Sequence, residues 1–120
     1  MPMTREIETS DEQVESAING LRDSLVENAR EEKALADDLD QVEQDRRRGH
    51  SWREITANGS GRAALARLGS ILARISEAGG AFRKALALAL VGEGESLSGI
   101  GRLFGVSRQR IFSLVHQRDK

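Results

Sequence analysis

Residues 97–116 read LSGIGRLFGVSRQRIFSLVH, and the small and apolar residues of this stretch fall where two packed helices and a tight turn need them. Gly101 stands where two crossing helices leave room only for a small residue, and Gly105 stands where the turn requires a positive φ. Five apolar residues are spaced to face a shared core, namely Ile100, Phe104, Val106, Ile111 and Leu114. The stretch therefore predicts two short helices joined by a turn.

The flanking residues supply caps and a third helix for this pair. Ser107 is placed to cap the second helix, and Ser96 or Ser98 the first. The segment from Phe82 to Val91 has helical spacing, and Gly92 and Gly94 follow it as stop signals. We expect this segment to complete a three-helix core through Phe82, Leu86 and Leu90.

The pattern resembles the helix-turn-helix of bacterial transcription regulators. The run LFGVSRQRI at residues 103–111 is especially similar to the final helix-turn-helix of sigma factors and site-specific recombinases. The longer stretch 47–115 is similar to small actinobacterial regulators that join a long N-terminal helix to such a motif. The resemblance implies that double-stranded DNA is the partner and that the helix starting near Ser107 lies in the major groove.

The same resemblance assigns roles to eight residues. Arg108 and Gln109 are the candidates for reading base edges, because Arg suits guanine and Gln suits adenine. Ser113 lies one turn further on and is expected to reach a base or a phosphate. Phe112 has two alternatives, contact with a thymine methyl group or packing at a protein interface. The remaining candidates are assigned to phosphates: Arg102, Ser107, Arg110 and Arg118.

The N-terminal third of the chain carries a different pattern. From about Ser10 to Arg48 the apolar residues alternate at intervals of four and three, which predicts one long, coiled-coil-like helix. The stripe consists of Val14, Ile18, Leu21, Leu25, Leu35, Leu39 and Val42, with Asn28 and Glu32 at the two polar positions between its halves. Thr9, Ser10 and Asp11 are the candidates for its N-cap.

A single amphipathic helix of this length cannot bury its stripe alone. It either pairs with a second copy of the chain or folds back on the C-terminal helices. We favour pairing, which predicts a homodimer through the N-terminal helix. The three arginines of residues 46–48, followed by Gly49, are typical of a helix end, where cations favour the dipole.

The middle of the chain predicts connecting helices. Ser51 and Glu54 have the spacing of a capping box, so a short helix begins after Ser51. Residues 57–61 then break the chain, and helical spacing returns from Arg62 to Ala78 before Gly79 and Gly80 end it. The predicted division is an acidic N-terminal helix at 1–48, connecting helices at 49–80 and a DNA-binding domain at 81–120, all of it α-helical.

Charge separates the two ends of the chain, although the net charge of the 120 residues is only −1. Residues 1–45 hold 14 acidic and 4 basic residues, whereas residues 46–120 hold 5 acidic and 14 basic ones. A basic half of this kind indicates a nucleic-acid contact. The chain has no cysteine, which excludes disulfides and thiolate chemistry. We find no catalytic constellation and expect no enzyme activity, cofactor or metal.

These observations predict a cytoplasmic, nucleoid-associated transcription regulator that binds a palindromic DNA site as a homodimer. No apolar run is long enough to span a bilayer, so no membrane contact is expected. The alternative is a protein-interaction module, for example one that contacts RNA polymerase, in which the acidic helix masks the basic helices.

Overall fold

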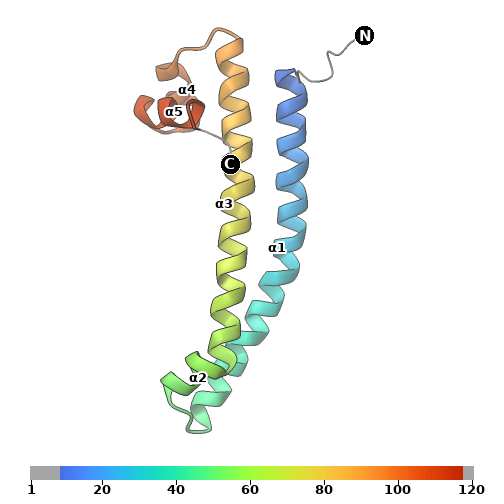
Figure 1. The fold of residues 1–120 in the computed structure, drawn as a ribbon, viewed down its shortest axis with the longest axis vertical. Coiled ribbons are helices and arrows are strands. Elements are labelled where there is room, and N and C mark those ends of the chain that lie inside the picture. Colours follow the sequence, from blue (N-terminus) through green and yellow to red (C-terminus); the bar gives the residue numbers. More distant parts are fainter. Residues whose placement is uncertain (1–8, 118–120) are drawn as a thin grey trace. The chain divides into compact units, whose positions relative to one another are not determined.

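The computed structural model describes residues 9–117, and within this range it contains helices and no strand. The helices are α1 (Ser10–Arg47), α2 (Trp52–Asn58), α3 (Ser60–Gly92), α4 (Leu97–Phe104) and α5 (Arg108–Val115) (Figure 1). The expected all-α class and the long N-terminal helix are confirmed. Across residues 9–117, none of the helices combines the length and the apolar character that a membrane span requires.

The described residues form two compact units, which we name by what they contain. The terminal unit comprises residues 9–21 and 78–117, and the hairpin unit comprises residues 22–77. Both α1 and α3 contribute one segment to each unit.

Both ends of α1 are set by local side-chain and backbone chemistry. Thr9 and Glu12 form a reciprocal cap, in which the Glu12 amide donates to Thr9 Oγ1 and the Thr9 amide donates to Glu12 Oε1. Thr9 is thus the N-cap among the three candidates. At the other end the helix stops at Arg47, and Gly49 has a φ of 97°, which an L side chain rarely adopts.

The corner between α2 and α3 depends on a capping box and a glycine. The Glu54 amide donates to Ser51 Oγ and the Ser51 amide donates to Glu54 Oε1, as the sequence predicted. These bonds to Ser51 lower the pKa of the Glu54 carboxyl. A Cβ on Gly61 would lie 2.8 Å from the carbonyl oxygen of Ile55, so only glycine allows α2 to approach α3 this closely.

Helix α3 differs from the prediction. Gly79 and Gly80 do not end a helix, and Ser60–Gly92 is continuous over 33 residues (Figure 1). Neither glycine adopts a positive φ, unlike Gly49, Gly94 and Gly105 at true turns. A glycine in a helix interior costs about 1 kcal/mol relative to alanine but ends the helix only where the backbone leaves helical angles. The alanine-rich segments on both sides supply enough helix propensity to continue.

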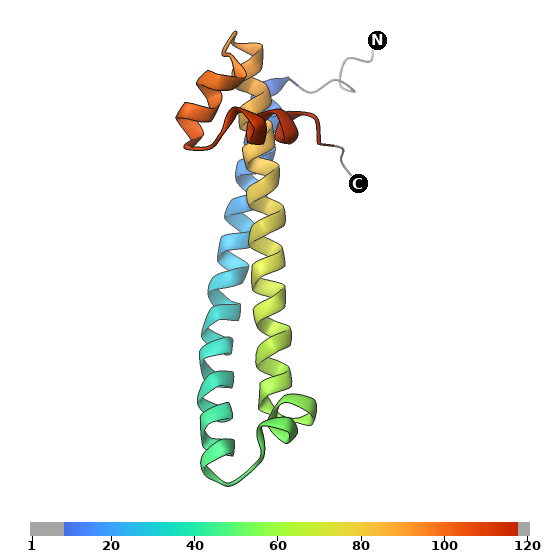
Figure 2. The same cartoon turned by 90° about the vertical axis from the view of Figure 1, so that its left-hand side faces the viewer.

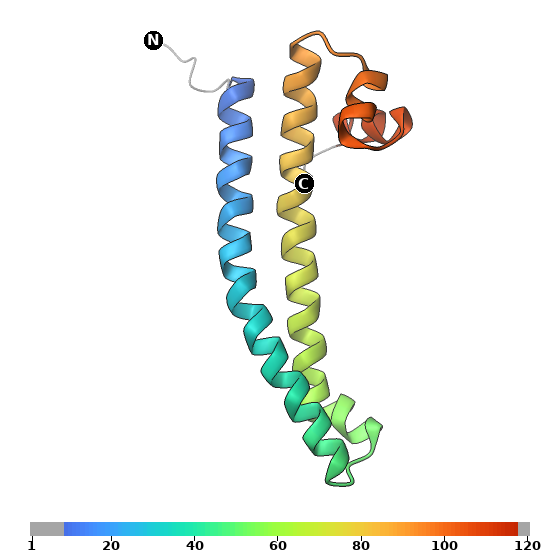
Figure 3. The same ribbon diagram turned by 180° about the vertical axis from the view of Figure 1, so that it is seen from behind.

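In the hairpin unit, α1 folds back against α3 of the same chain (Figure 3). Asn28, at the first polar position of the heptad stripe, is only 3% exposed. Its Nδ2 donates to the carbonyl oxygen of Ile71 at 3.2 Å, and its Oδ1 accepts from Arg74 Nη1 at 2.7 Å. The stripe is therefore at least partly engaged within the chain, while Leu25 and Leu39 of the same stripe stay exposed.

Ion pairs and a capping carboxylate reinforce one flank of this hairpin. Arg67 Nε lies 2.8 Å from Asp38 Oδ2, and its Nη1 lies 3.3 Å from Glu31 Oε2. The hydrogen bond to Asp38 raises the pKa of the Arg67 guanidinium. Asp45 Oδ2 accepts from Ser60 Oγ at 2.7 Å, which lowers the pKa of the Asp45 carboxyl. Two acidic residues of α1 thus pair with one arginine of α3 on this flank, and a third accepts from a serine of α3.

In the terminal unit, the C-terminal part of α3 packs with α4 and α5 (Figure 2). The centre of this core is fully buried and consists of Ala87, Ile100 and Ile111. Leu97, Phe104, Leu114, Val115 and Leu90 pack around it. Of the expected α3 members, only Leu90 belongs to this cluster; Phe82 and Leu86 are half-buried outside it.

We expected Val106 to face the shared core of α4 and α5, and this expectation was wrong, because the side chain is 41% exposed. The turn that begins at Gly105 brings the carbonyl oxygen of Val106 over Gly101, and this placement of the backbone leaves the side chain outside the core.

Candidate nucleic-acid interface

The turn between α4 and α5 is fixed by two glycines. The Val106 amide donates to the carbonyl oxygen of Gly101 at 2.9 Å, and Gly105 has a φ of 75°. A Cβ on Gly101 would lie 2.7 Å from the Val106 carbonyl oxygen and 3.3 Å from the carbonyl carbon of Ser107. Any side chain at 101 would therefore push the start of α5 away from α4.

Helix α5 begins at a serine cap. Ser107 Oγ accepts from the Arg110 amide at 3.1 Å, in the same way that Ser96 Oγ accepts from the Gly99 amide at the start of α4. Both caps are among those that the sequence predicted. The Ser107 hydroxyl keeps its own proton to donate, and the side chain is exposed.

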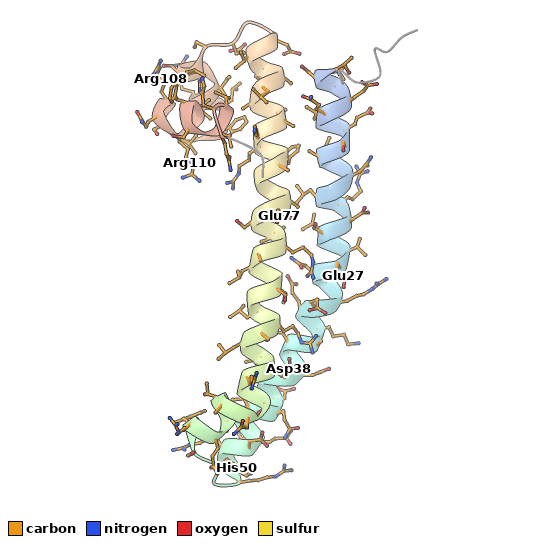
Figure 4. All side chains as sticks on the ribbon, in the orientation of Figure 1. Glu27, Asp38, His50, Glu77, Arg108 and Arg110 are labelled. Atoms are coloured by element: carbon orange, nitrogen blue, oxygen red, sulfur yellow. The ribbon has the colours of Figure 1, made fainter. Side chains whose placement is uncertain are left out.

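The inward side of α5 carries Ile111, Leu114 and Val115, so the opposite side faces solvent. Gln109 and Ser113 lie one turn apart on this outward side, and both are exposed. Arg108 and Arg110 are also exposed and leave the helix on different sides, as residues two positions apart on a helix must (Figure 4). The exposed side of α5 is thus a polar strip between two guanidinium groups.

Phe112 lies on the same exposed side and is 44% exposed. Its ring lies 4.2 Å from the ring of His116, centroid to centroid, and His116 Nδ1 lies 2.9 Å from the Phe112 carbonyl oxygen. His116 follows Phe112 by four residues, the spacing at which side chains on one helix meet. The aromatic ring is therefore held in place at the surface.

Two of the predicted phosphate contacts are not on α5 as the structure describes it. Arg102 is exposed in the last turn of α4. Arg118 lies outside the described residues. The structure therefore places seven of the eight predicted site residues on α4, α5 and the serine cap between them.

A further contact holds the end of α5 and was not predicted. Lys84 Nζ donates to the carbonyl oxygen of Gln117, which joins the α3 segment of the terminal unit to the residues after α5. The sequence gave no specific signal for this bond, because the two residues lie 33 positions apart.

Metal-ligand chemistry has no support here. Residues 9–117 contain no group of three or more His, Asp or Glu side chains placed to hold a metal ion.

Comparisons of the chain with protein-family models, curated proteins and solved structures found no match. The chemistry of the interface therefore has to be argued from its residues.

Proposed function

We propose that the chain is a sequence-specific, DNA-binding transcription regulator in which α4 and α5 form a helix-turn-helix and α5 enters the major groove. The observation that carries this proposal is the packing of the Val106 carbonyl over Gly101, with Gly105 in the left-handed region. This backbone arrangement holds α5 against α4 and leaves the first turn of α5 exposed, as groove entry requires.

The exposed residues of α5 suit the two kinds of contact that such a helix makes. Arg108 and Gln109 stand in the first turn, where side chains reach base edges. Arg110 and the hydroxyl of Ser107 at the start of α5, together with Arg102 on α4, supply donors for phosphate oxygens. The uncapped amides at the start of α5 add a favourable field for an anion.

The proposal is tested by selecting bound sequences from a random double-stranded DNA pool with the full chain. Gel shifts then compare a selected duplex with a scrambled duplex of equal length. Arg108→Ala and Gln109→Ala each should weaken binding to the selected duplex about 10-fold to 100-fold, corresponding to about 1–3 kcal/mol for a bidentate base contact. Binding to the scrambled duplex should change far less.

The matched control is Arg30→Ala, which removes one exposed arginine from α1. This variant should bind both duplexes as the parent chain does. Affinity for the selected duplex should also fall steeply as salt rises, because phosphate contacts release counterions. Salt-independent binding, or equal losses on both duplexes for Arg108→Ala, would remove the base-reading role.

The second candidate function is a protein-interaction module that binds an acidic surface, such as one on RNA polymerase. The observation in its favour is apolar exposure beside the basic residues: Leu103 is 67% exposed, and Val106 and Phe112 are about half exposed. Phe112→Ala and Leu103→Ala distinguish the two functions. Loss of polymerase binding with DNA binding intact would favour the interaction module.

The expectation that the acidic helix masks the basic helices stays a prediction. Deleting residues 1–45 would not test masking cleanly, because α3 of the hairpin unit would lose Asn28 and Asp38 as partners. Neutralising the exposed acids Asp11 and Glu15 of α1 is the cleaner test, because neither takes part in the Thr9–Glu12 cap. Masking predicts a rise in DNA affinity in this variant.

A further inference from the structure

Between Arg62 and Glu77, the face of α3 that points away from α1 carries no charge. Between Arg62 and Glu77, the only charged side chains are Arg67 and Arg74. Both are engaged with α1, Arg67 with Asp38 and Glu31, and Arg74 with Asn28. Solvated helix faces are normally rich in charged residues, so three and a half uncharged turns facing away from α1 are unusual for a surface.

Large apolar side chains stand on this uncharged face. Leu65, Leu68 and Leu72 are spaced to form one stripe, and their exposed fractions are 59%, 40% and 57%. The residues next to the stripe are small, including Ala66, Gly69 and Ala73. Small residues allow another helix axis to come close, and nothing lies within 4 Å of a Cβ built on Gly69.

Helix α1 extends this stripe into a two-helix surface. Arg67 and Arg74 reach α1 on one flank of the hairpin, so the leucines of α3 lie on the other flank. Leu25 and Leu39 occupy that same flank of α1 by their helical positions, and they are 52% and 53% exposed. We call the five residues the leucine flank: Leu25, Leu39, Leu65, Leu68 and Leu72.

We infer that the leucine flank is a contact surface for a second copy of this chain, with α3 of one copy packed on α3 of the other. Two hairpins joined in this way form a four-helix bundle, which supplies the apolar core that one hairpin lacks. Within the hairpin unit, the buried apolar residues are only Ile55, Ala64 and Ile71.

The charge distribution favours a second copy of this chain as the partner and α3 as the contact helix. Residues 22–47 of α1 hold 9 acidic and 5 basic residues, so a symmetric contact centred on α1 would bring like charges together. A symmetric contact centred on α3 brings none together. The hairpin unit as a whole is nearly neutral, with 11 acidic and 10 basic residues, and near-neutral surfaces favour self-association.

The area of the surface is adequate for such a dimer. Five half-exposed leucines present on the order of 400 Å² of apolar surface, the size at which an exposed patch marks an interaction site. The leucines of two copies together bury on the order of 800 Å², and the small residues beside each stripe add to this area, which is the range of weak, reversible interfaces. This inference does not depend on DNA binding, and it places the contact on α3, whereas the sequence pattern favoured α1.

The first test measures the mass of the full chain by sedimentation without DNA. The parent chain should have twice the 13.1 kDa of one copy at micromolar concentration. Leu68→Glu combined with Leu72→Glu should weaken self-association at least about 100-fold, because two unpaired charges would be buried in each copy. The matched control is Val26→Glu, at an exposed apolar residue of α1 outside the leucine flank, which should leave the dimer intact.

The second test uses the absence of cysteine in the chain, which makes a single introduced thiol unambiguous. Gly69→Cys should form a disulfide-linked dimer on mild oxidation, whereas Val26→Cys should not. Circular dichroism confirms that each variant keeps its helices. A parent chain that stays at 13.1 kDa at about 100 μM, or equal cross-linking at positions 26 and 69, would overturn the inference. If the chain fails to bind DNA in the gel shift, the sedimentation mass and the disulfide cross-linking still test the dimer.

Discussion

The two units of this chain differ in how they bury their apolar side chains. The terminal unit closes a small apolar core in which Ala87, Ile100 and Ile111 are fully buried. The hairpin unit instead buries Asn28 and bridges its helices with polar contacts from Arg67 and Arg74. It keeps five leucines at its surface. The terminal unit thus has a closed apolar centre, although Leu103, Val106 and Phe112 stay at its surface, whereas the hairpin unit connects its helices through polar contacts and leaves a row of leucines outside.

This difference indicates a division of labour. A unit with a closed core can present polar side chains to a polar partner, as α5 does with Arg108 and Gln109. A unit with an open apolar flank is complete only when another apolar surface covers it. The same contrast predicts that the two units respond differently to substitution.

The largest effect is expected at the centre of the terminal core. Ile111→Ala removes a side chain that is 0% exposed and should lower the free energy of unfolding by about 2–4 kcal/mol. Leu103→Ala, at a side chain that is 67% exposed, should stay within about 0.5 kcal/mol. Urea unfolding followed by circular dichroism measures both.

The single tryptophan sharpens this comparison. Trp52 lies in the hairpin unit, with Arg46 Cζ 4.8 Å from its ring centroid, so its fluorescence reports on that unit. In the Ile111→Ala variant, the urea midpoint measured by tryptophan fluorescence should move less than the urea midpoint measured by circular dichroism. Equal movement would show that the two units unfold as one, and the contrast between them would then be structural only.

A smaller effect is expected at the glycine under the turn. Gly101→Ala places a Cβ 2.7 Å from the Val106 carbonyl oxygen and should cost about 1–3 kcal/mol. Gly20→Ala is the matched control, because nothing lies within 4 Å of a Cβ there. It should stabilise α1 by up to about 1 kcal/mol. The two thermal midpoints should therefore move in opposite directions, and a stabilised Gly101→Ala would contradict the packing described for the turn.

The buried polar contact of the hairpin unit is expected to have an intermediate to small effect. Asn28→Ala leaves Arg74 without its partner at 2.7 Å and should cost about 1–2 kcal/mol. Arg74→Ala should cost less, because it leaves a neutral amide. In the double variant, the loss in free energy of unfolding should be smaller than the sum of the two single losses. Urea unfolding of all three variants measures this coupling. Additive losses would mean that Asn28 and Arg74 stabilise the hairpin separately.

Local chemistry explains which features the sequence predicted. The Ser51 and Ser107 caps and the left-handed Gly105 each depend on residues within a few positions, so spacing was enough to predict them. For α1 the spacing narrowed the cap only to Thr9, Ser10 or Asp11. The continuous α3 was missed because Gly79 and Gly80 signal a break only if no long-range packing supports the helix. The burial of Asn28 depends on Arg74, 46 residues away, and no local pattern encodes that pairing.

The candidate interface shows the same limit. The order of Ser107, Arg108 and Gln109 fixes their place at the start of a helix, and their exposure followed from the core positions of Ile111 and Leu114. The exposure of Val106 did not follow, because it depends on where the turn directs the backbone over Gly101. The choice between folding back and pairing was open in the sequence, since one heptad stripe serves both arrangements.

The smallest expected effect is a pH dependence confined to the hairpin unit. The hydrogen bond from Ser60, with a second from Gln41, lowers the pKa of Asp45 below its ordinary value of 3.8. A carboxyl whose pKa is lowered by folding contributes stability above its ordinary pKa, and this contribution is lost as the pH falls through the folded value. The urea midpoint of the Trp52 fluorescence should therefore be constant at higher pH and fall as the pH drops below about 4.

Asp45→Asn should reduce this fall, because the amide has no proton to gain. Ser60→Ala should reduce it in the same way, since it removes the main cause of the lowered pKa. Glu54, whose pKa is lowered by its bonds to Ser51, contributes in the same direction and accounts for part of the fall that remains. If Ser60→Ala keeps the full pH dependence while Asp45→Asn loses it, the contribution comes from the hydrogen bond of Gln41 and the charges of His50 and Arg48, and the Ser60–Asp45 bond is not its source.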